Sequence, residues 1–217
     1  MHTYLNFIHN QWVAGPGSYT VTNPATEEAV GQVSAASTAQ ALAAVDAAAA
    51  AQRGWRKLTS IERGNHLRAL ADALVARKSA IGQALALESG KSLEDAENEA
   101  VYAADITRYH AEWARRIEGE IIPSDSPGEN LMLHREPMGV VACLIPFNYP
   151  VYTLLRKIAP ALITGNTVVV RPSNHTPCSA FEIAQAVLDA GLPPGVVNIL
   201  AMGHVEAEAL CTHPKVA

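Results

Sequence analysis

The clearest pattern of hydrophobic and polar positions lies between residues 139 and 212. It predicts, in order, a strand at 139–145, a helix at 150–163, a strand at 167–171, a helix at 177–190, a strand at 196–200 and a helix at 204–212. The strand segments are apolar and rich in β-branched side chains, which is typical of strands buried on both faces. Pro150 fits the first turn of a helix, and Gly165 with Asn166 fits a left-handed cap at its end.

This alternation predicts a parallel sheet, because a strand, a crossover helix and a second parallel strand form a βαβ unit. Ligands of such sheets bind at the carboxyl ends of the strands. Asn148 follows the first strand and Arg171 ends the second, so we expect both residues at the ligand-binding edge. The predicted fold class is therefore α/β, with a Rossmann-like parallel sheet preceded by a helical subregion and a short N-terminal β segment.

The N-terminal half predicts short strands followed by four helices. The helices are expected to begin at Ser37-Thr38, near Ser60, near Ala80 and after Ser92, and the last of them to end near Gly119. The apolar face of this fourth helix is expected to contain Ala96, Ala100, Ala103, Ile106, Tyr109 and Trp113. We divide the chain into a β segment (1–35), a helical part (36–122), a connecting segment with a strand at 130–135 (123–138) and the βαβ part (139–217).

Composition narrows the class of protein. With 217 residues, of which 49% are hydrophobic, the chain is globular and has a sizeable core. The net charge of −5 and the lack of a basic run argue against a nucleic-acid surface, and no apolar stretch reaches the ~18 to 20 residues of a membrane span. Three widely spaced cysteines and no signal peptide favour the cytoplasm, and the eight histidines indicate no metal site.

Five segments carry a resemblance to a known family. They are NPAT at 23–26, ESGK at 88–91, EPMGVVACLIPFNYP at 136–150, KIAPALITGNTVVVRPSNHTP at 157–177 and GLPPGVVNIL at 191–200. In this order and spacing they resemble the N-terminal, coenzyme-binding part of the aldehyde dehydrogenase superfamily. The resemblance implies a parent enzyme that oxidises an aldehyde to a carboxylic acid with NAD or NADP, through thiolate attack, hydride transfer and thioester hydrolysis. It also implies a homo-oligomer in which the segment 123–138 is a hairpin that takes part in subunit association.

The resemblance also implies a set of site residues. Asn148 matches the catalytic asparagine that stabilises the oxyanion, although by itself an asparagine after a strand would be interpreted as a turn cap. The matching cofactor-binding residues are Ile145, Pro146, Phe147, Asn148, Lys157, Arg171, Ser173, Asn174 and Gly203. For Lys157, a solvated or helix-capping lysine is the alternative interpretation.

Two of these positions bear on the choice of coenzyme. Family members usually have Lys where this chain has Arg171, and Glu where it has Asn174. An acidic residue that binds the ribose 2′-hydroxyl would repel a 2′-phosphate, and Asn174 removes that repulsion. The guanidinium of Arg171 can bind phosphate with two parallel hydrogen bonds. We therefore expect that NADP is tolerated, with NAD bound through other contacts as the alternative.

The segment before the last helix leaves the reaction outcome open. Gly203 is kept, but Ala207 stands at the second glycine position of many family members, and the loop is one residue short. This favours a second hypothesis, a semialdehyde dehydrogenase of the same superfamily that transfers the acyl group to coenzyme A, whereas Asn148 favours the hydrolytic enzyme. A third hypothesis is a non-catalytic nucleotide-binding or assembly module.

The cysteines do not supply the expected nucleophile. Cys143 lies inside a predicted buried strand, where apolar surroundings raise the pKa of a thiol and keep it inert. None of the three cysteines stands in the nucleophile motif of the family, and the general-base glutamate is also missing. Since Lys215-Val216-Ala217 resembles the opening of another strand, we interpret the chain as the N-terminal part of a longer enzyme. We expect it to be inactive by itself.

Overall fold

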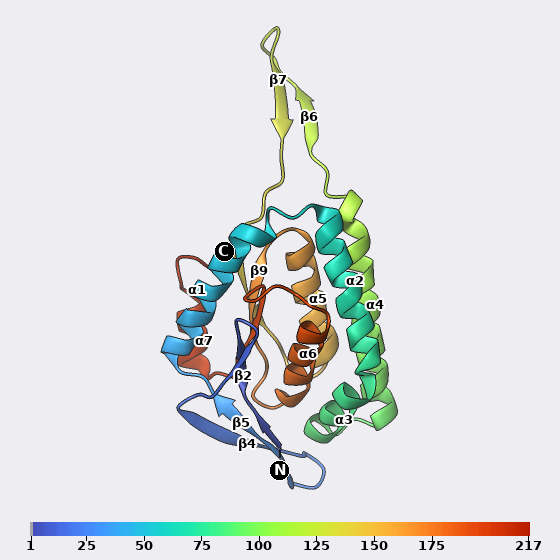
Figure 1. Ribbon diagram of the computed structural model, residues 1–217, viewed down its shortest axis with the longest axis vertical. Helices are drawn as coiled ribbons and strands as arrows, with labels where there is room; N and C mark the ends of the chain where they lie inside the picture. Colours follow the sequence, from blue (N-terminus) through green and yellow to red (C-terminus); the bar gives the residue numbers. More distant parts are fainter. Residues whose placement is uncertain (1) are drawn as a thin grey trace.

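The computed structural model describes residues 2–217 and contains a five-stranded sheet flanked by helices (Figure 1). Its strand order is β3-β2-β10-β9-β8. The strands β8 (Val140–Leu144), β9 (Thr167–Arg171) and β10 (Val197–Ile199) are parallel, with Val140 paired to Thr167 and Val168 paired to Val197. The predicted α/β fold and its parallel strands are therefore confirmed.

Helices cover both faces of this sheet. The helices α5 (Pro150–Ile163) and α6 (Cys178–Asp189) lie on one face, and α1 (Thr38–Trp55) and α7 (His204–Cys211) lie on the other (Figure 1). The side chains of β9 alternate accordingly. Val168 and Val170 belong to the larger core with α5 and α6, whereas Val169 belongs to the smaller core with α1 and α7.

The N-terminal strands divide between two sheets. Strand β2 (Asn6–Ile8) pairs antiparallel with β10, and β3 (Gln11–Val13) pairs with β2, so both extend the main sheet. The strands β1 (His2–Tyr4), β4 (Gly17–Thr22) and β5 (Ala29–Ala35) form a separate three-stranded sheet. Sequence reasoning placed the strands in this region but did not place β2 beside β10.

Three more helices form an outer layer, α2 (Ser60–Ala76), α3 (Lys78–Ser89) and α4 (Leu93–Ala111). The expected starts of α2 and α4 are confirmed, with Thr59 and Ser92 as their N-caps. The expected end of α4 near Gly119 is wrong, because the α-helix stops at Ala111 and a 3-10 turn follows over Glu112–Arg115. The tightened turn redirects the chain toward the hairpin that follows.

The expected apolar face of α4 is only partly buried. Its alanines pack in the core, but Tyr109 is 51% exposed and Trp113 is 38% exposed. The helical period marks a stripe of apolar residues, and here the C-terminal end of that stripe faces a surface groove and solvent instead of another element.

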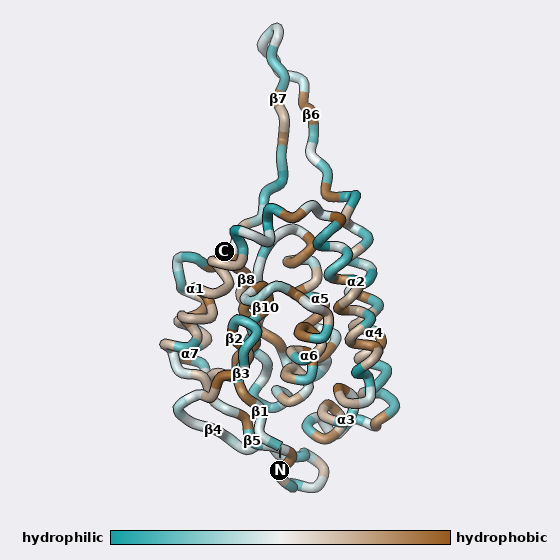
Figure 2. The backbone as a smooth tube through the Cα atoms, in the orientation of Figure 1, coloured by the Kyte–Doolittle hydropathy of each residue, from teal (hydrophilic) through white to brown (hydrophobic). Residues whose placement is uncertain are grey.

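A two-stranded hairpin projects from the body of the protein (Figure 1). Its strands are β6 (Glu120–Pro123) and β7 (Asn130–Leu133), so the strand expected at 130–135 ends two residues earlier. Figure 2 shows hydrophobic positions on both strands. The exposed apolar side chains are Ile121, Ile122, Leu131, Met132 and Leu133.

The last residues lie beside β8. Val216 forms a parallel bridge with Val140, and the Ala217 N–H donates to the Val140 carbonyl at 3.0 Å. The expected opening of another strand is thus confirmed by a single β-bridge.

Within residues 2–217, no helix has both the length and the apolar character that crossing a membrane requires. The same residues contain no group of three His, Cys, Asp or Glu side chains suited to a metal ion.

Candidate active site and coenzyme edge

The structure brings the predicted site residues to one edge of the sheet, where β8, β9 and β10 end. Ile145 follows β8 and is buried, and the next three residues, Pro146 to Asn148, form an exposed loop before α5. Arg171 ends β9, and Gly203 precedes α7, the helix that follows β10. Parallel strands therefore place segments more than fifty residues apart in sequence side by side.

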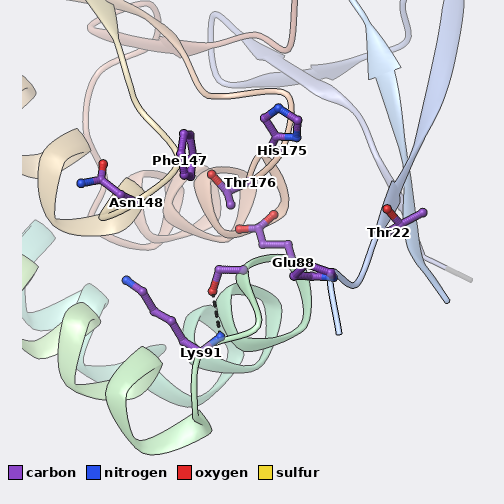
Figure 3. A pocket seen from close by; sticks show the side chains of 9 residues that line it. Thr22, Glu88, Lys91, Phe147, Asn148, His175 and Thr176 are labelled. Atoms are coloured by element: carbon purple, nitrogen blue, oxygen red, sulfur yellow. Dashed lines mark hydrogen bonds between the residues drawn. The ribbon is translucent and has the colours of Figure 1, made fainter. Parts of the chain in front are cut away.

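Asn148 lies where two surface hollows meet. The first hollow has a volume of about 500 Å³ and is also lined by Phe147, Lys91 and Glu88. The second hollow has a volume of about 800 Å³ and is lined by side chains of α4 and α5. Figure 3 shows Phe147, Thr176 and His175 along one side of the first hollow, with Lys91 reaching across from the opposite side. No hydrogen bond joins the Asn148 amide to another residue in 2–217, so its N–H groups are available to a ligand.

The second hollow is a groove lined by aromatic and charged side chains. Its lining residues are Tyr102, Asp105, Ile106, Tyr109, Asn148, Tyr149, Tyr152, Thr153 and Arg156. Within residues 2–217, Asp105 forms a salt bridge with Arg108, whereas Arg156 forms none. The groove therefore offers one uncompensated cation near the Asn148 amide.

The loop after β9 and the loop before α7 are linked by a hydrogen bond. The Nε of Arg171 donates to the Met202 carbonyl at 3.3 Å, which leaves the terminal guanidinium nitrogens for another partner. Ser173 is buried and its Oγ accepts the His175 N–H at 3.2 Å, whereas Asn174 is exposed. The arrangement holds Arg171 beside the N-terminus of α7.

Gly203 is the N-cap of α7 and has an ordinary φ of −72°. Its backbone conformation therefore does not require glycine. A Cβ added there would meet only the carboxylate of Glu206, at 2.8 Å, which is the movable end of a side chain. The flexible Glu206 side chain lies beside the first N–H groups of this helix, so an anion can approach them only when that carboxylate turns away.

Lys157 lies on α5 and is exposed. Its Nζ donates to the Leu144 carbonyl at 2.5 Å, at the end of β8. This lysine therefore binds the end of a strand at the site edge, and the contact is not the helix cap that was the alternative interpretation.

Two buried glutamates hold the helices that follow the site loops. Glu88 accepts the backbone N–H groups of Cys178 at 2.6 Å and Ser179 at 3.0 Å, at the start of α6. Burial raises the pKa of Glu88 to about 7, although these hydrogen bonds lower it. Glu99 plays the corresponding part at the start of α5, where it accepts from Val151 and Tyr152.

Cys143 lies in a buried strand, as the sequence predicts. Cys143 is 2% exposed inside β8, and burial raises the pKa of its thiol to about 12. Cys178 is also buried, and burial together with the nearby Glu88 carboxyl raises its pKa further above the ordinary value. Neither thiol is suited to act as a nucleophile at neutral pH.

Comparisons with known proteins agree with this geometry. The sequence model of the Aldehyde dehydrogenase family matches residues 12–217. The chain belongs to the aldehyde dehydrogenase family. It is 42% identical to lactaldehyde dehydrogenase of Escherichia coli over 97% of its own length, and 40% identical to a mitochondrial succinate-semialdehyde dehydrogenase of Arabidopsis thaliana over 96%. These matches cover 45% and 40% of the two relatives, so the chain spans less than half of their length.

Solved aldehyde dehydrogenase structures have the same fold as this chain. A lactaldehyde dehydrogenase structure superposes with a TM-score of 0.96 at 41% identity, covering 99% of this chain and 46% of that one. An NADP-dependent glyceraldehyde-3-phosphate dehydrogenase from Bacillus halodurans, complexed with NADP, superposes with a TM-score of 0.94 at 34% identity. The match covers 100% of this chain and 45% of that one.

Sequence reasoning missed the part that four residues play at this site. Glu88 and Lys91 were used only as part of a matching tetrapeptide, and Glu99 was not singled out at all. A charged residue inside an otherwise alanine-rich helical face, as at Glu99, is the signal that could have found it. The place of Arg156 in the groove could not be predicted, because it depends on how α4 packs against α5.

Proposed function

We propose that this chain provides the oxyanion-stabilising asparagine and the coenzyme edge of an NAD(P)-dependent aldehyde dehydrogenase, which oxidises an aldehyde to a carboxylic acid. The observation that carries the proposal is the position of Asn148, an amide without a partner in residues 2–217 at the carboxyl end of a parallel strand and at the junction of two hollows. When a nucleophile attacks an aldehyde, the carbonyl oxygen becomes negative. The Asn148 side chain donates a hydrogen bond to that oxygen and stabilises the transition state.

The proposed coenzyme site follows the same edge. The wall of this proposed site beside β8 consists of Ile145, Pro146 and Phe147. Lys157 donates a hydrogen bond to the carbonyl of Leu144, at the end of the same strand. The free N–H groups at the N-terminus of α7 suit a pyrophosphate, provided that the Glu206 carboxylate beside Gly203 turns away. A nicotinamide coenzyme held at this edge would supply the hydride acceptor. We keep Ser173 in the set because its buried hydroxyl shapes the turn that follows Arg171.

Arg171 and Asn174 support a coenzyme site that accepts NADP as well as NAD. The guanidinium has nitrogens left for a 2′-phosphate, and Asn174 is exposed and carries no repelling charge. The NADP complex of the Bacillus halodurans relative is consistent with this choice. Equal tightness for the two coenzymes, or tighter NADP binding, in a fluorescence titration supports the assignment, whereas a hundredfold preference for NAD would contradict it.

The groove beside Asn148 supports an aldehyde that carries a carboxylate. Several relatives are named for such substrates, among them succinate-semialdehyde and glutarate-semialdehyde dehydrogenases. Arg156 is a cation without a salt bridge in residues 2–217, on the same groove wall as Tyr152 and Thr153. A semialdehyde could place its carboxylate at Arg156 and its aldehyde at Asn148. Lactaldehyde, for which another relative is named, carries no charge and would not use Arg156 in this way.

The hairpin of β6 and β7 supports a homo-oligomer. Its five exposed apolar side chains project from the body, and such a surface is costly to leave in water. Sedimentation or light scattering of the whole protein should therefore give a dimer or a larger assembly. Replacement of Ile121 and Met132 by Lys should shift it toward the monomer.

The deciding experiment uses the whole protein to which this sequence belongs and compares Asn148→Ala with the wild type. We expect kcat for aldehyde oxidation to fall by about 10²- to 10³-fold while coenzyme binding stays unchanged. Asn65→Ala, a substitution on the surface of α2, is the matched control and should keep full activity. Unchanged turnover in Asn148→Ala would contradict the proposal, and a wild-type protein that binds nucleotide without oxidising any aldehyde would favour a non-catalytic module.

A second outcome, transfer of the acyl group to coenzyme A, is favoured by the α7 segment, where Ala207 stands in place of a second glycine and is 9% exposed. Product analysis separates the two. A free carboxylic acid formed without coenzyme A supports the hydrolytic enzyme, and a product that requires coenzyme A supports the acyl-transferring one.

A further inference from the structure

A buried carboxylate lies behind the loop that carries Asn148. Glu99 belongs to α4 and is only 1% exposed. One of its oxygens accepts the backbone N–H groups of Val151 at 2.9 Å and Tyr152 at 3.1 Å, and the other accepts from the ammonium of Lys91. Both carboxylate oxygens are therefore engaged, as burial of a charge requires.

Glu99 replaces a cap that α5 lacks. The N-cap residue of this helix, Tyr149, provides no side-chain hydrogen bond, and Pro150 has no N–H to donate. The first free N–H groups of α5 are thus those of Val151 and Tyr152, and Glu99 accepts both. A negative charge is most favourable at this end of a helix.

Lys91 secures the same loop from its other side. It lies in the turn between α3 and α4, and its Nζ is 3.9 Å from the centre of the Tyr149 ring. Figure 3 shows its side chain extending toward the segment that contains Asn148. The ion pair with Glu99 and the cation–π contact with Tyr149 together tie residues 149–152 to α4.

Asn148 depends on this attachment for its orientation. Its own amide makes no hydrogen bond within residues 2–217, so the direction of its N–H groups is set by the backbone that continues into α5. A donor that stabilises an oxyanion must lie about 3 Å from the developing charge, and small displacements reduce its effect.

We propose that Glu99, held by Lys91, is a positioning residue that sets the orientation of the Asn148 side chain through the N-terminus of α5. It touches neither substrate nor coenzyme. The inference rests on the proposed function for its kinetic consequence, but its structural consequence stands apart from any activity.

The first test is structural and needs no substrate. In the whole protein labelled with ¹⁵N-asparagine, the side-chain amide signal of Asn148 is identified by its loss in Asn148→Ala. In Glu99→Gln this signal should shift or broaden, while that of Asn198, which is buried in β10 and donates to the carbonyls of Val168 and Gly195, should stay in place. Glu99→Gln has the same size, so the helix packing is kept, but it offers one acceptor oxygen instead of two and no charge, so it cannot accept the two N–H groups and also pair with Lys91. An unmoved Asn148 signal would overturn the inference whether or not the protein oxidises aldehydes.

The second test is a double-mutant cycle on kcat. Glu99→Gln should lower kcat by about tenfold, which is less than the loss of the donor itself, and should leave the dissociation constant of the coenzyme unchanged. In the Asn148→Ala background the same substitution should have almost no effect, because its target is gone. Thr59→Ala, which removes the N-cap of α2, controls for a general loss of helix stability and should not alter kcat.

The outcomes separate the two levels of the proposal. Independent, multiplying effects of Glu99→Gln and Asn148→Ala would overturn the positioning role while the proposed function stands. Full turnover in Asn148→Ala would refute the proposed function, and the asparagine signal would then decide the positioning role by itself.

Discussion

Glu88 offers a direct test of how burial and hydrogen bonding compete at a carboxyl group. Its carboxyl is 3% exposed and accepts the N–H groups of Cys178 and Ser179 together with the Ser179 hydroxyl. Hydrogen bonds favour the charged form, whereas burial disfavours it. Burial dominates, because the pKa rises from 4.5 to about 7. The perturbation we consider is Glu88→Gln, which removes the titration.

The sign of the effect follows from proton binding. Between pH 4.5 and about 7 the folded state holds a proton on Glu88 that the unfolded state has released, so stability falls as the pH rises through this window. A pKa shift of this size changes the free energy of unfolding by about 3 kcal/mol in total. About 2 to 3 kcal/mol of this change occurs between pH 5 and pH 8. The free energy of unfolding of the wild type should therefore decrease by that amount relative to Glu88→Gln.

The assay is urea unfolding of both proteins at pH 5, 6, 7 and 8, with extrapolation to water. The difference between the two unfolding free energies cancels the groups that titrate in both proteins. A difference that does not change with pH would mean that Glu88 is not perturbed. A wild type that gains relative stability as the pH rises would mean that the start of α6 stabilises the carboxylate more than burial destabilises it, and would refute the reasoning.

Three further predictions concern stability and reactivity. Trp55→Phe should lower the free energy of unfolding by about 1 to 3 kcal/mol, because the buried indole N–H donates to the Leu162 carbonyl at 2.9 Å; a loss below ~0.5 kcal/mol in urea unfolding would contradict this. Ser37→Ala should cost about 1 kcal/mol, since Ser37 forms a capping box at the start of α1, and thermal unfolding checks it against the wild type. Alkylation at pH 8, followed by peptide mass spectrometry, should modify exposed Cys211 well before Cys143, whose pKa is about 12; equal rates would contradict the burial of Cys143.

The sequence predicts the elements of this fold well because its signals are local. Strands β8 and β9 are short apolar runs between a turn and a glycine, and α5 begins at a proline, so their bounds agree with the structure to within one residue at either end. The left-handed Gly165, with a φ of +89°, confirms the expected cap.

The arrangement around the site is less predictable because its contacts join distant segments. Glu88 and Cys178 are ninety residues apart, and Glu99 and Val151 are fifty-two apart. No periodicity along the chain marks such a pair. The exposure of Tyr109 has a similar origin, since helical spacing identifies an apolar stripe but not what covers it.

The pairing of β2 with β10 has a consequence for biosynthesis. Phe7 pairs with Ile199, and the Asn6 side chain accepts the Ala201 N–H, so the partners of this hairpin lie about 190 positions later in the chain. At ordinary translation rates the N-terminal hairpin must wait for roughly ten to forty seconds before its neighbouring strand exists. During that interval Phe7, fully buried in the finished protein, has no strand β10 to cover it, so its apolar ring stays in contact with water until β10 is synthesised.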